Sequence, residues 1–341
     1  MRVLLIKTSS LGDVIHTLPA LTDARRAIPD IRFDWVVEEG FAEIPGWHPA
    51  VEEVIPVAIR RWRKNILKTW RTGEWRAFKQ KLANRQYDLI IDAQGLLKSA
   101  MLTRLNSAPS AGYDRQSIRE PAASRFYNKR YSVSRQAHAV ERIRQLFALA
   151  LDYPLPQDVG DYGIELSRLP TVAAPQQPFV VFCHGTTWKT KHWPESYWRE
   201  LAEKESQQGR KVLLPWGNEE EKARAKRIAE GLSQVEVLPK LSLWEVAGLL
   251  SQAQQVVAVD TGLGHLTAAV GTPAVALYGP TDPTLTSSYG RNQQILSSTL
   301  PCAPCLSKHC LLPKDEQDKA PAWPPCLAQL TPDRVAHTRQ K

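Results

Sequence analysis

Several familiar catalytic and membrane-spanning signatures are absent from this sequence of 341 residues. There is no Walker loop and no Gly-x-Ser-x-Gly elbow, which argues against an ATPase or a serine hydrolase. No loop carries an Asp-x-Asp pair with which to hold a metal ion against a phosphate. No apolar run is long enough to span a bilayer. The opening apolar segment, residues 2–6, is too short for a signal-peptide core, and we therefore expect a cytosolic protein.

The sequence does contain an alternation of short apolar runs and amphipathic segments. In the first half, strands are predicted at 3–6, 33–37, 54–57 and 88–92, and helices after residue 13, from 94 through 105 and over 138–151. Pro19 is expected to bend the first of these helices. In the second half, strands are predicted at 179–183, 211–214, 235–238, 255–259 and 274–277, and helices at 193–207, 219–230 and after Ser242. Ser242 and Glu245 have the spacing of a capping box.

This alternation predicts an α/β protein with two Rossmann-like, doubly wound domains, each a parallel sheet covered on both faces. The chain length also suits two domains. Residues 1–153 would form the first domain, and residues 179–341 the second, which ends in a tail rich in Cys and Pro. Residues 154–178 contain five prolines and are interpreted as a linker. Ligands are expected in a cleft between the carboxyl-end loops of the two domains.

The turn Asp260-Thr261-Gly262 joins a predicted strand to a helix that contains His265. The first amides of a helix and the positive end of its dipole can bind a phosphate group. Glycine at 262 and 264 would leave room for a ligand to approach the backbone. A capping Asp and a core His explain the same residues, and the turn alone favours that simpler interpretation.

Other polar residues follow predicted strands. Asp13 could be a general base or could merely cap the next helix. The hydroxyls of Thr186 and Thr187, with the ammonium of Lys191, suit a diphosphate, but an exposed turn with solvated lysines is the alternative. Glu221 could accept hydrogen bonds from sugar hydroxyls or could lie at an ordinary solvated helix start.

The net charge of +9 is concentrated between residues 60 and 85, where ten Lys or Arg residues accompany a single acid, Glu74. Trp62, Trp70 and Trp75 are interleaved with these cations. Such a segment could bind nucleic acid, an anionic membrane or a phosphorylated lipid, or could form a solvated helical face. The tryptophans favour an interface, because indole suits the boundary between apolar and aqueous surroundings.

The tail holds four of the five cysteines, whereas Cys183 belongs to a predicted core strand. A cytosolic setting disfavours disulfides, so a structural metal or a redox-labile cluster stays open for Cys302, Cys305, Cys310 and Cys326. Their spacing matches no standard zinc or ferredoxin pattern, and His309 is a further possible ligand.

Three spaced motifs resemble the ADP-heptose:lipopolysaccharide heptosyltransferases of glycosyltransferase family 9: residues 7–21, Lys191-His192-Trp193-Pro194, and residues 260–269. Segments 33–41, 60–64, 92–96 and 119–121 are similar to the members that act on the inner Kdo sugar. The resemblance implies a GT-B fold, in which two Rossmann-like domains face each other across a cleft. It also implies inverting, metal-independent transfer of L-glycero-D-manno-heptose from ADP-heptose, without a cofactor.

The acceptor implied by the resemblance is Kdo₂-lipid A, and nucleic acid is not an expected partner. The protein would be cytoplasmic and peripheral on the inner face of the inner membrane of a Gram-negative bacterium. Asp13 would be the catalytic base, and Lys191 would stabilise the leaving ADP. The donor site would comprise Thr186, Thr187, Lys191, Glu221, Leu241, Asp260, Thr261, Gly262 and His265. Candidates for binding the acceptor are Arg60, Arg61, Arg63, Lys64 and Arg119.

Leu241 stands where relatives carry a Met beside the adenine. The four tail cysteines depart from the pattern of the members that act on the inner Kdo sugar, whereas clustered cysteines near the end occur elsewhere in the wider family. Two alternatives stay open. One is a family member that uses the same donor on an acceptor already carrying heptose. The other is a non-catalytic basic protein that binds nucleic acid or a membrane.

Overall fold

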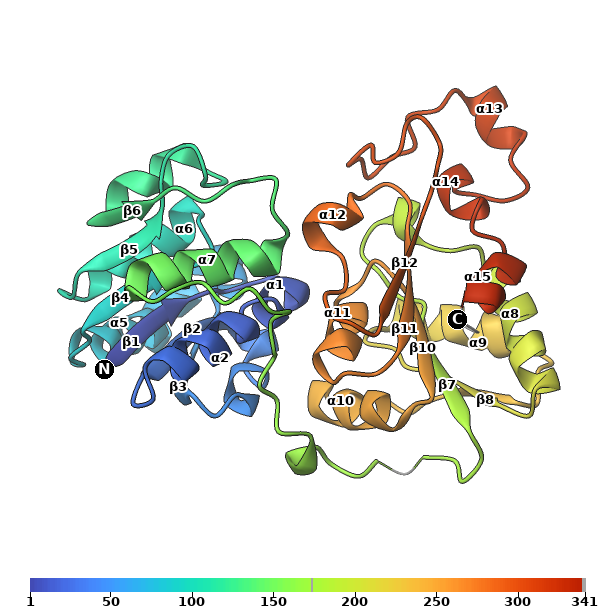
Figure 1. The fold of residues 1–341 in the computed structure, drawn as a ribbon, viewed down its shortest axis with the longest axis horizontal. Coiled ribbons are helices and arrows are strands. Elements are labelled where there is room, and N and C mark those ends of the chain that lie inside the picture. The colour runs from blue at the N-terminus through green and yellow to red at the C-terminus, as the bar shows by residue number, and fades with distance from the viewer. Residues whose placement is uncertain (173, 339–341) are drawn as a thin grey trace. The chain divides into compact units, whose positions relative to one another are not determined.

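The computed structural model describes residues 1–172 and 174–338, and Figure 1 shows their ribbon. Residue 173 of the predicted linker and residues 339–341 of the predicted second domain lie outside the described residues. The chain divides into two compact units, Met1–Glu165 and Leu166–Lys341. The division falls inside the range interpreted as a linker. Within the described chain, no helix has the length and apolar character needed to cross a membrane.

Unit 1 is built on a six-stranded parallel sheet with the order β3-β2-β1-β4-β5-β6. Its strands are β1 (Arg2–Ile6), β2 (Arg32–Glu38), β3 (Val51–Val57), β4 (Leu89–Asp92), β5 (Ser110–Tyr113) and β6 (Lys129–Tyr131). The central strands are runs of Val, Ile and Leu that are buried on both faces, as a covered parallel sheet requires. Strands β5 and β6 were not predicted, because neither contains an apolar run of its own.

The helices of unit 1 are α1 (Leu11–Ile15), α2 (Leu18–Ala27), α3 (Ile59–Lys64), α4 (Ile66–Thr72), α5 (Glu74–Ala83), α6 (Leu97–Ala100) and α7 (Ala139–Leu151), with the 3-10 turns η1 (Glu39–Phe41), η2 (Pro45–Trp47), η3 (Met101–Leu105) and η4 (Pro121–Phe126). The bent helix predicted around Pro19 is wrong. Pro19 lies in the first turn of a separate helix, α2, where a missing amide costs no hydrogen bond. The helix predicted after the Gln94-Gly95 turn and through Leu105 is present but is not one α-helix, since α6 passes into the 3-10 turn η3 at Met101.

Unit 2 contains a second parallel sheet with the order β12-β11-β10-β7-β8-β9. Its elements are β7 (Phe179–Cys183), β8 (Lys211–Leu214), β9 (Val235–Val237), β10 (Gln255–Val259), β11 (Ala274–Tyr278), β12 (Gln293–Ser297), α8 (Glu195–Gln207), α9 (Glu219–Ala229), α10 (Leu243–Gln252), α11 (Gly262–Ala269), α12 (Pro283–Thr286), α13 (Lys314–Asp318), α14 (Pro325–Ala328), α15 (Pro332–Thr338), η5 (Leu166–Arg168) and η6 (Lys189–Lys191). The predicted capping box of α10 is confirmed, since Glu245 N donates to Ser242 Oγ and Ser242 N donates to Glu245 Oε2. Helix α8 begins at Glu195 and not at Trp193, because Pro194 is the cap residue and a proline disfavours helical backbone in the residue before it. Trp193 is buried in the core and donates its Nε1 to Leu330 O.

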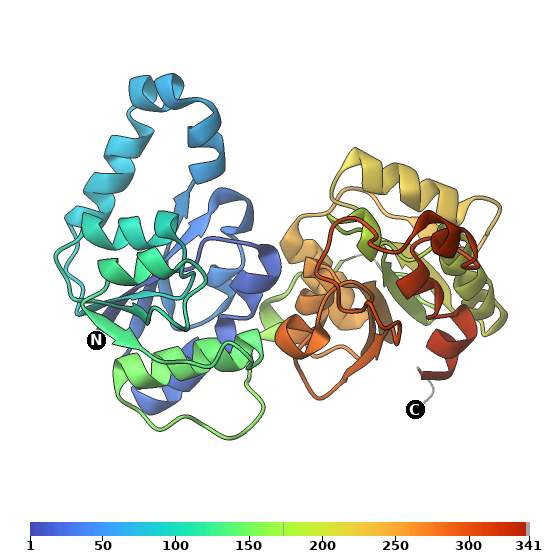
Figure 2. The same cartoon turned by 90° about the horizontal axis from the view of Figure 1, so that it is seen from above.

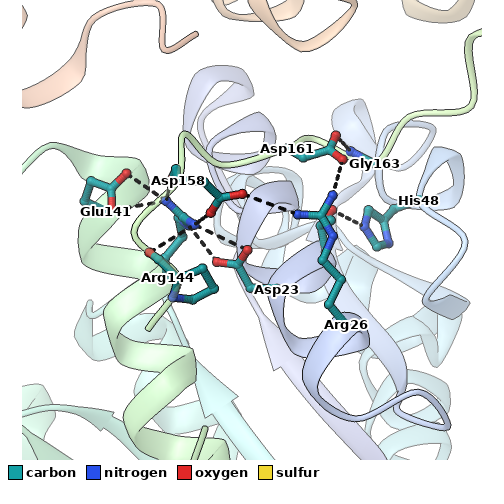
Figure 3. A network of polar contacts seen from close by, with 10 residues as sticks. Asp23, Arg26, His48, Glu141, Arg144, Asp158, Asp161 and Gly163 are labelled. Carbon is teal, nitrogen blue, oxygen red and sulfur yellow. Dashed lines mark hydrogen bonds and ion pairs between the residues drawn. The ribbon is translucent and has the colours of Figure 1, made fainter. Parts of the chain in front are cut away.

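The residues interpreted as a linker are attached at both ends. Figure 3 shows Arg144 of α7 between Asp23 of α2, at 2.6 Å, and Asp158, at 3.1 Å. Arg26 binds Asp161 at 2.7 Å. Further along the chain, Pro170 lies so close to α10 that a Cβ added at Gly248 would be 2.3 Å from Pro170 O. The first part of the range therefore belongs to unit 1, and the part around residue 170 to unit 2.

Candidate functional site

In unit 1, the loop that follows β1 is joined to the loop that follows β4. Lys7 Nζ donates to Ala93 O at 3.1 Å, and the amides of Thr8 and Ser9 donate to Gln94 Oε1 at 2.9 and 3.0 Å. Strands β1 and β4 are parallel neighbours, so their carboxyl ends meet at one edge of the sheet. These bonds hold the two loops as one surface at that edge.

The buried carboxylate of Asp92 holds the loop that follows β4. Asp92 Oδ1 accepts hydrogen bonds from the amides of Gln94 and Gly95, and its Oδ2 accepts from the hydroxyls of Ser99 and Tyr127. Burial raises the pKa of Asp92, and the hydrogen bonds only partly oppose that rise. Asp92 is therefore a structural support for the loops.

Asp13 lies in the third position of α1, next to Lys7 of this surface. Its Oδ2 accepts hydrogen bonds from Ser10 N at 2.8 Å and Ser10 Oγ at 2.9 Å, and its Oδ1 lies 3.4 Å from Lys7 Nζ. The carboxylate thus caps the helix, as one interpretation predicted, yet 42% of the side chain stays accessible. Both predicted uses of Asp13 fit this geometry, because capping occupies only one of its two oxygens.

The charge state of Asp13 follows from its neighbours. Burial by itself raises the pKa of the carboxyl group, but the Lys7 ammonium and the hydrogen bonds from Ser10 outweigh burial and lower that pKa below its ordinary value. At neutral pH the group is a carboxylate that can accept a proton.

The predicted acceptor cations are divided among three places. Arg60, Arg61 and Lys64 line one pocket of about 410 Å³ beside Glu38 and Glu39. This pocket lies at the same sheet edge as Asp13, because Glu38 N donates to Thr8 O and Arg60 N donates to Glu38 Oε1.

Within that pocket, Arg61 is held by two carboxylates. Its guanidinium makes a two-pronged contact with Glu39, at 3.1 and 3.0 Å, and also binds Glu74. Arg63 instead lines a separate apolar groove with Trp62, Trp70 and Trp75. Arg119 is exposed in the loop after β5, next to Ile118, whose side chain lies against Gly95.

The three tryptophans of the basic segment have different environments, and only one of them has the exposure that the predicted interface requires. Trp62 and Trp75 pack against Phe78 and the unit 1 core, with ring centroids 5.6 and 5.7 Å from that of Phe78. Trp62 Nε1 also donates to Glu74 Oε2 at 2.8 Å. Trp70 alone of the three is exposed, at 81%.

In unit 2, the loop after β7 is joined to the loop after β10. Thr186 Oγ1 donates to Asp260 O at 2.9 Å, and Lys191 Nζ lies 2.6 Å from Asp260 Oδ2. The same carboxylate oxygen accepts from Thr281 Oγ1, in the loop after β11. The structure therefore brings Thr186, Lys191 and Asp260 together. Thr187 is exposed in the loop. The Lys191 ammonium also lies 4.5 Å from the ring centroid of Trp188.

The loop after β8 reaches the same edge through Glu221. Glu221 Oε2 accepts from Gly217 N at 2.7 Å, and a Cβ added at Gly185 would lie 2.7 Å from Glu221 Cδ. The side chain therefore turns back over the loop after β7 and is not directed outward from a solvated helix start. Leu241 is half-buried two residues before α10.

The turn before α11 fits the simpler interpretation of its sequence only in part, because the core histidine is confirmed and the capping Asp is wrong. Asp260 does not cap the helix, because Thr261 occupies the cap position and Asp260 binds Lys191 and Thr281. His265 is buried within the helix. Gly264 is closely packed by the protein itself, since a Cβ there would be 3.3 Å from Ala258 Cβ and from Ser288 Oγ. Gly262 begins α11, where the first amides of a helix can meet an anion.

The four tail cysteines border one small cavity of about 20 Å³, and each is a free thiol, as is Cys183. Burial raises the pKa of Cys326 to about 11, and its neighbouring thiols act in the same direction. No group of three or more His, Cys, Asp or Glu side chains that could hold a metal ion occurs among residues 1–172 and 174–338.

Some contributing residues were missed from the sequence. Lys7, Gln94, Trp188 and Thr281 hold or flank the candidate groups. All four lie within a few residues of the carboxyl end of a parallel strand, and that position is the signal that could have identified them.

Comparison with known proteins adds to this geometry. Residues 75–315 match the model of glycosyltransferase family 9 (heptosyltransferase). The chain is 61% identical to lipopolysaccharide heptosyltransferase 1 of Pseudomonas aeruginosa, over 98% of this chain and 96% of that protein. It is similar to the structure of E. coli heptosyltransferase WaaC with ADP-2-deoxy-2-fluoro heptose, with 50% identity, a TM-score of 0.84 and coverage of 100% and 99%. It shares the fold of E. coli ADP-heptose lps heptosyltransferase II, with 21% identity, a TM-score of 0.78 and coverage of 100% and 98%.

Proposed function

The chain belongs to glycosyltransferase family 9, and from that membership we propose that it transfers heptose from ADP-heptose to the inner Kdo sugar of Kdo₂-lipid A. It is a glycosyltransferase of the GT-B fold, and its function is heptose transfer in the inner core of lipopolysaccharide. The observation that carries the donor assignment is the cluster of Thr186, Lys191 and Asp260 at one edge of the unit 2 sheet.

The donor would bind to unit 2 through its diphosphate. The Lys191 ammonium, the hydroxyls of Thr186 and Thr187 and the amides at the start of α11 are the groups that can offset negative charge there. Because Lys191 is paired with Asp260, its ammonium is already positioned before ADP-heptose arrives. In the proposed reaction this charge stabilises the leaving ADP without a metal ion.

The acceptor would bind to unit 1. Arg60, Arg61 and Lys64 line the pocket beside the Asp13 loop and suit the carboxylates and phosphates of a Kdo-containing lipid. Asp13 would take the proton from the attacking Kdo hydroxyl. The hydroxyl oxygen then forms a bond to the anomeric carbon of the heptose as the bond to the diphosphate breaks, which inverts the configuration. We further propose that the protein acts in the cytoplasm at the inner face of the inner membrane, where such a lipid would be presented.

A product assay with defined acceptors tests this proposal. Wild-type protein and ADP-heptose should convert Kdo₂-lipid A, and should leave the already heptosylated acceptor unchanged. Asp13→Ala should lower kcat by about 10²–10⁴-fold while the affinity for ADP stays within a few-fold. Asp30→Ala, which removes an exposed acid of the same unit, is the matched control and should retain activity. Conversion of the heptosylated acceptor alone would instead assign the second transfer.

A further inference from the structure

The helical projection of unit 1 carries an apolar groove that the proposed reaction does not use. The groove has a volume of about 370 Å³ and is lined by Ile59, Trp62, Arg63, Thr69, Trp70, Trp75, Lys98, Met101 and Leu102. These residues come from α3, α4, α5, α6 and η3. In Figure 2 the helices of residues 59–83 extend away from the sheet of unit 1.

The outer face of this projection is unusually apolar. Leu67 and Trp70 are 80% and 81% exposed, the highest values for large hydrophobic side chains in the part of the chain that the structure describes. They are three residues apart on α4, so they share one face of that helix. Met101, at 58%, lies beside the same groove. Clustered apolar exposure of this kind marks an interaction surface.

An aromatic cluster lies beneath the groove. Trp62, Trp75 and Phe78 contact one another with centroid distances of 5.6 to 5.7 Å, and they pack on the unit 1 core. Trp62 is fixed further by its hydrogen bond to Glu74. The exposed side chains of α4 therefore lie beside a packed aromatic cluster, and they can contact a partner without any rearrangement of the core.

The charges around the groove identify its partner. Arg63 and Lys98 line it, and the described lining residues include no acid. A second copy of this chain would bring the same cation-rich segment against itself in a two-fold contact, which like charges oppose. An anionic bilayer instead offers negative headgroups to the cations, an interface for indole and an apolar interior for Leu67 and Met101.

We propose that α4 and the adjoining groove dock the enzyme on an anionic phospholipid bilayer, through contacts separate from the acceptor pocket of Arg60, Arg61 and Lys64. This inference rests on the proposed function in one respect only, namely that a lipid acceptor brings the enzyme to a membrane. The docking surface would then set how much enzyme is bound to the bilayer, and the acceptor pocket would set catalysis.

Co-sedimentation with vesicles tests the docking surface directly. Wild-type protein should bind vesicles containing phosphatidylglycerol more tightly than vesicles of phosphatidylcholine alone. The variant Leu67→Ser/Trp70→Ser should bind the anionic vesicles about tenfold more weakly, because its apolar contribution is lost. The matched control is Leu311→Ser/Trp323→Ser, which removes one exposed Leu and one exposed Trp from unit 2 and should bind like wild type.

Activity measurements separate docking from catalysis. With a water-soluble Kdo acceptor that lacks acyl chains, Leu67→Ser/Trp70→Ser should match the wild-type kcat/KM, and with acceptor embedded in anionic vesicles it should be about tenfold lower. Unchanged vesicle binding by this variant, or equal wild-type binding to both vesicle types, overturns the proposal. So does a wild-type dimer that the variant converts to monomer, since the occupant would then be a second copy. If wild-type protein transfers heptose to neither acceptor, the proposed function fails while the vesicle result still decides the docking surface.

Discussion

At the scale of single residues, the protonation of Asp13 depends on a neighbour that is not among the predicted site residues. Lys7 is almost fully buried and places its ammonium between Ala93 O and Asp13 Oδ1. The cation lowers the pKa of Asp13 and so keeps the carboxylate available as a base. Lys7 is thereby a positioning residue for the proposed base.

Replacing Lys7 with Met should move the acid limb of the pH profile of kcat/KM to higher pH. Loss of the ammonium favours the protonated form of Asp13, so its pKa rises and a higher pH is needed to generate the carboxylate. Ser10→Ala should shift the limb in the same direction by less, because the backbone hydrogen bond remains. The pH profile of heptose transfer measures both, with Ser9→Ala as the control. A limb that moves to lower pH would contradict the assignment of Asp13 as the base.

His48 is a second residue whose ionisation is set by the fold. Ala50 N donates to its Nδ1, so its Nε2 carries the proton and donates to Thr22 Oγ1. Burial, helped by the charge of Arg25, lowers the pKa of His48 to about 4. Because the unfolded chain binds a proton near pH 6.5 and the folded chain does not, this residue contributes stability at neutral pH that is lost as the pH falls.

The free energy of unfolding should therefore decrease by about 2–3 kcal/mol through His48 between pH 6.5 and pH 4, at ~1.4 kcal/mol per pKa unit. His48→Asn should show a shallower decline over that window, measured by urea unfolding at several pH values. The exposed residue His309 provides the control variant, His309→Asn, which should follow wild type. An unchanged slope in His48→Asn would show that the buried ring does not account for the decline.

At the scale of elements, α2, α7 and the following segment are held together by one buried arginine. Arg144 is 1% exposed, and its partner Asp23 is fully buried, while Glu141 and Asp158 complete the contacts shown in Figure 3. A nearby pair, Arg26 and Asp161, is more than half exposed. The two pairs have similar separations but differ in how much water surrounds them.

Arg144→Met should lower the free energy of unfolding by about 3–5 kcal/mol, because Asp23 is left as an uncompensated buried charge. The double variant Arg144→Met/Asp23→Leu should recover most of that loss. Arg26→Met, which breaks the exposed pair, should cost under ~1 kcal/mol. Urea unfolding of the three variants measures the contrast, and equal costs for the buried and exposed arginines would contradict it.

At the scale of the whole molecule, the two units contain different parts of the proposed chemistry. The predicted donor residues Thr186, Lys191, Glu221 and Asp260 all belong to unit 2, whereas Asp13 and the predicted acceptor cations belong to unit 1. Transfer therefore requires the substrates held by the two units to meet in the catalytic complex. Residues 158–163 are attached to unit 1 and Pro170 to α10, so the chain between them is the segment that joins the units.

Hydrogen exchange on the full chain should reveal this division. ADP should protect amides in 184–191, 217–221 and 260–265 and should leave 59–83 unchanged.

Lys191→Met should bind ADP about tenfold or more weakly, because it removes a charge-assisted hydrogen bond and leaves the Asp260 carboxylate facing the diphosphate. The same amides should then lose protection at equal ADP. Protection confined to 59–83 would place the nucleotide on unit 1 and contradict the donor assignment.

The sequence by itself determined the α/β class, most strands of both sheets, the capping box of α10 and the loops in which candidate residues lie. These features are local, since apolar runs, turn residues and caps act within a few positions of the chain. The short strands β5 and β6 were not predicted, because a strand without an apolar run is stabilised mainly by the neighbouring strand with which it pairs.

Only the tertiary structure decided which side chains meet. Three contacts depend on which parallel strands are adjacent, and residue spacing does not encode strand order. They are the ion pair of Lys191 with Asp260, the approach of Glu221 to Gly185 and the hydrogen bond from Thr281 to Asp260. The fold likewise divides one basic segment between two places: Arg60, Arg61 and Lys64 line the pocket beside Glu38 and Glu39, whereas Arg63 lines the apolar groove with the tryptophans. Contacts between distant residues arise only when the strands assemble, and for that reason the residues of the proposed site meet at the strand ends.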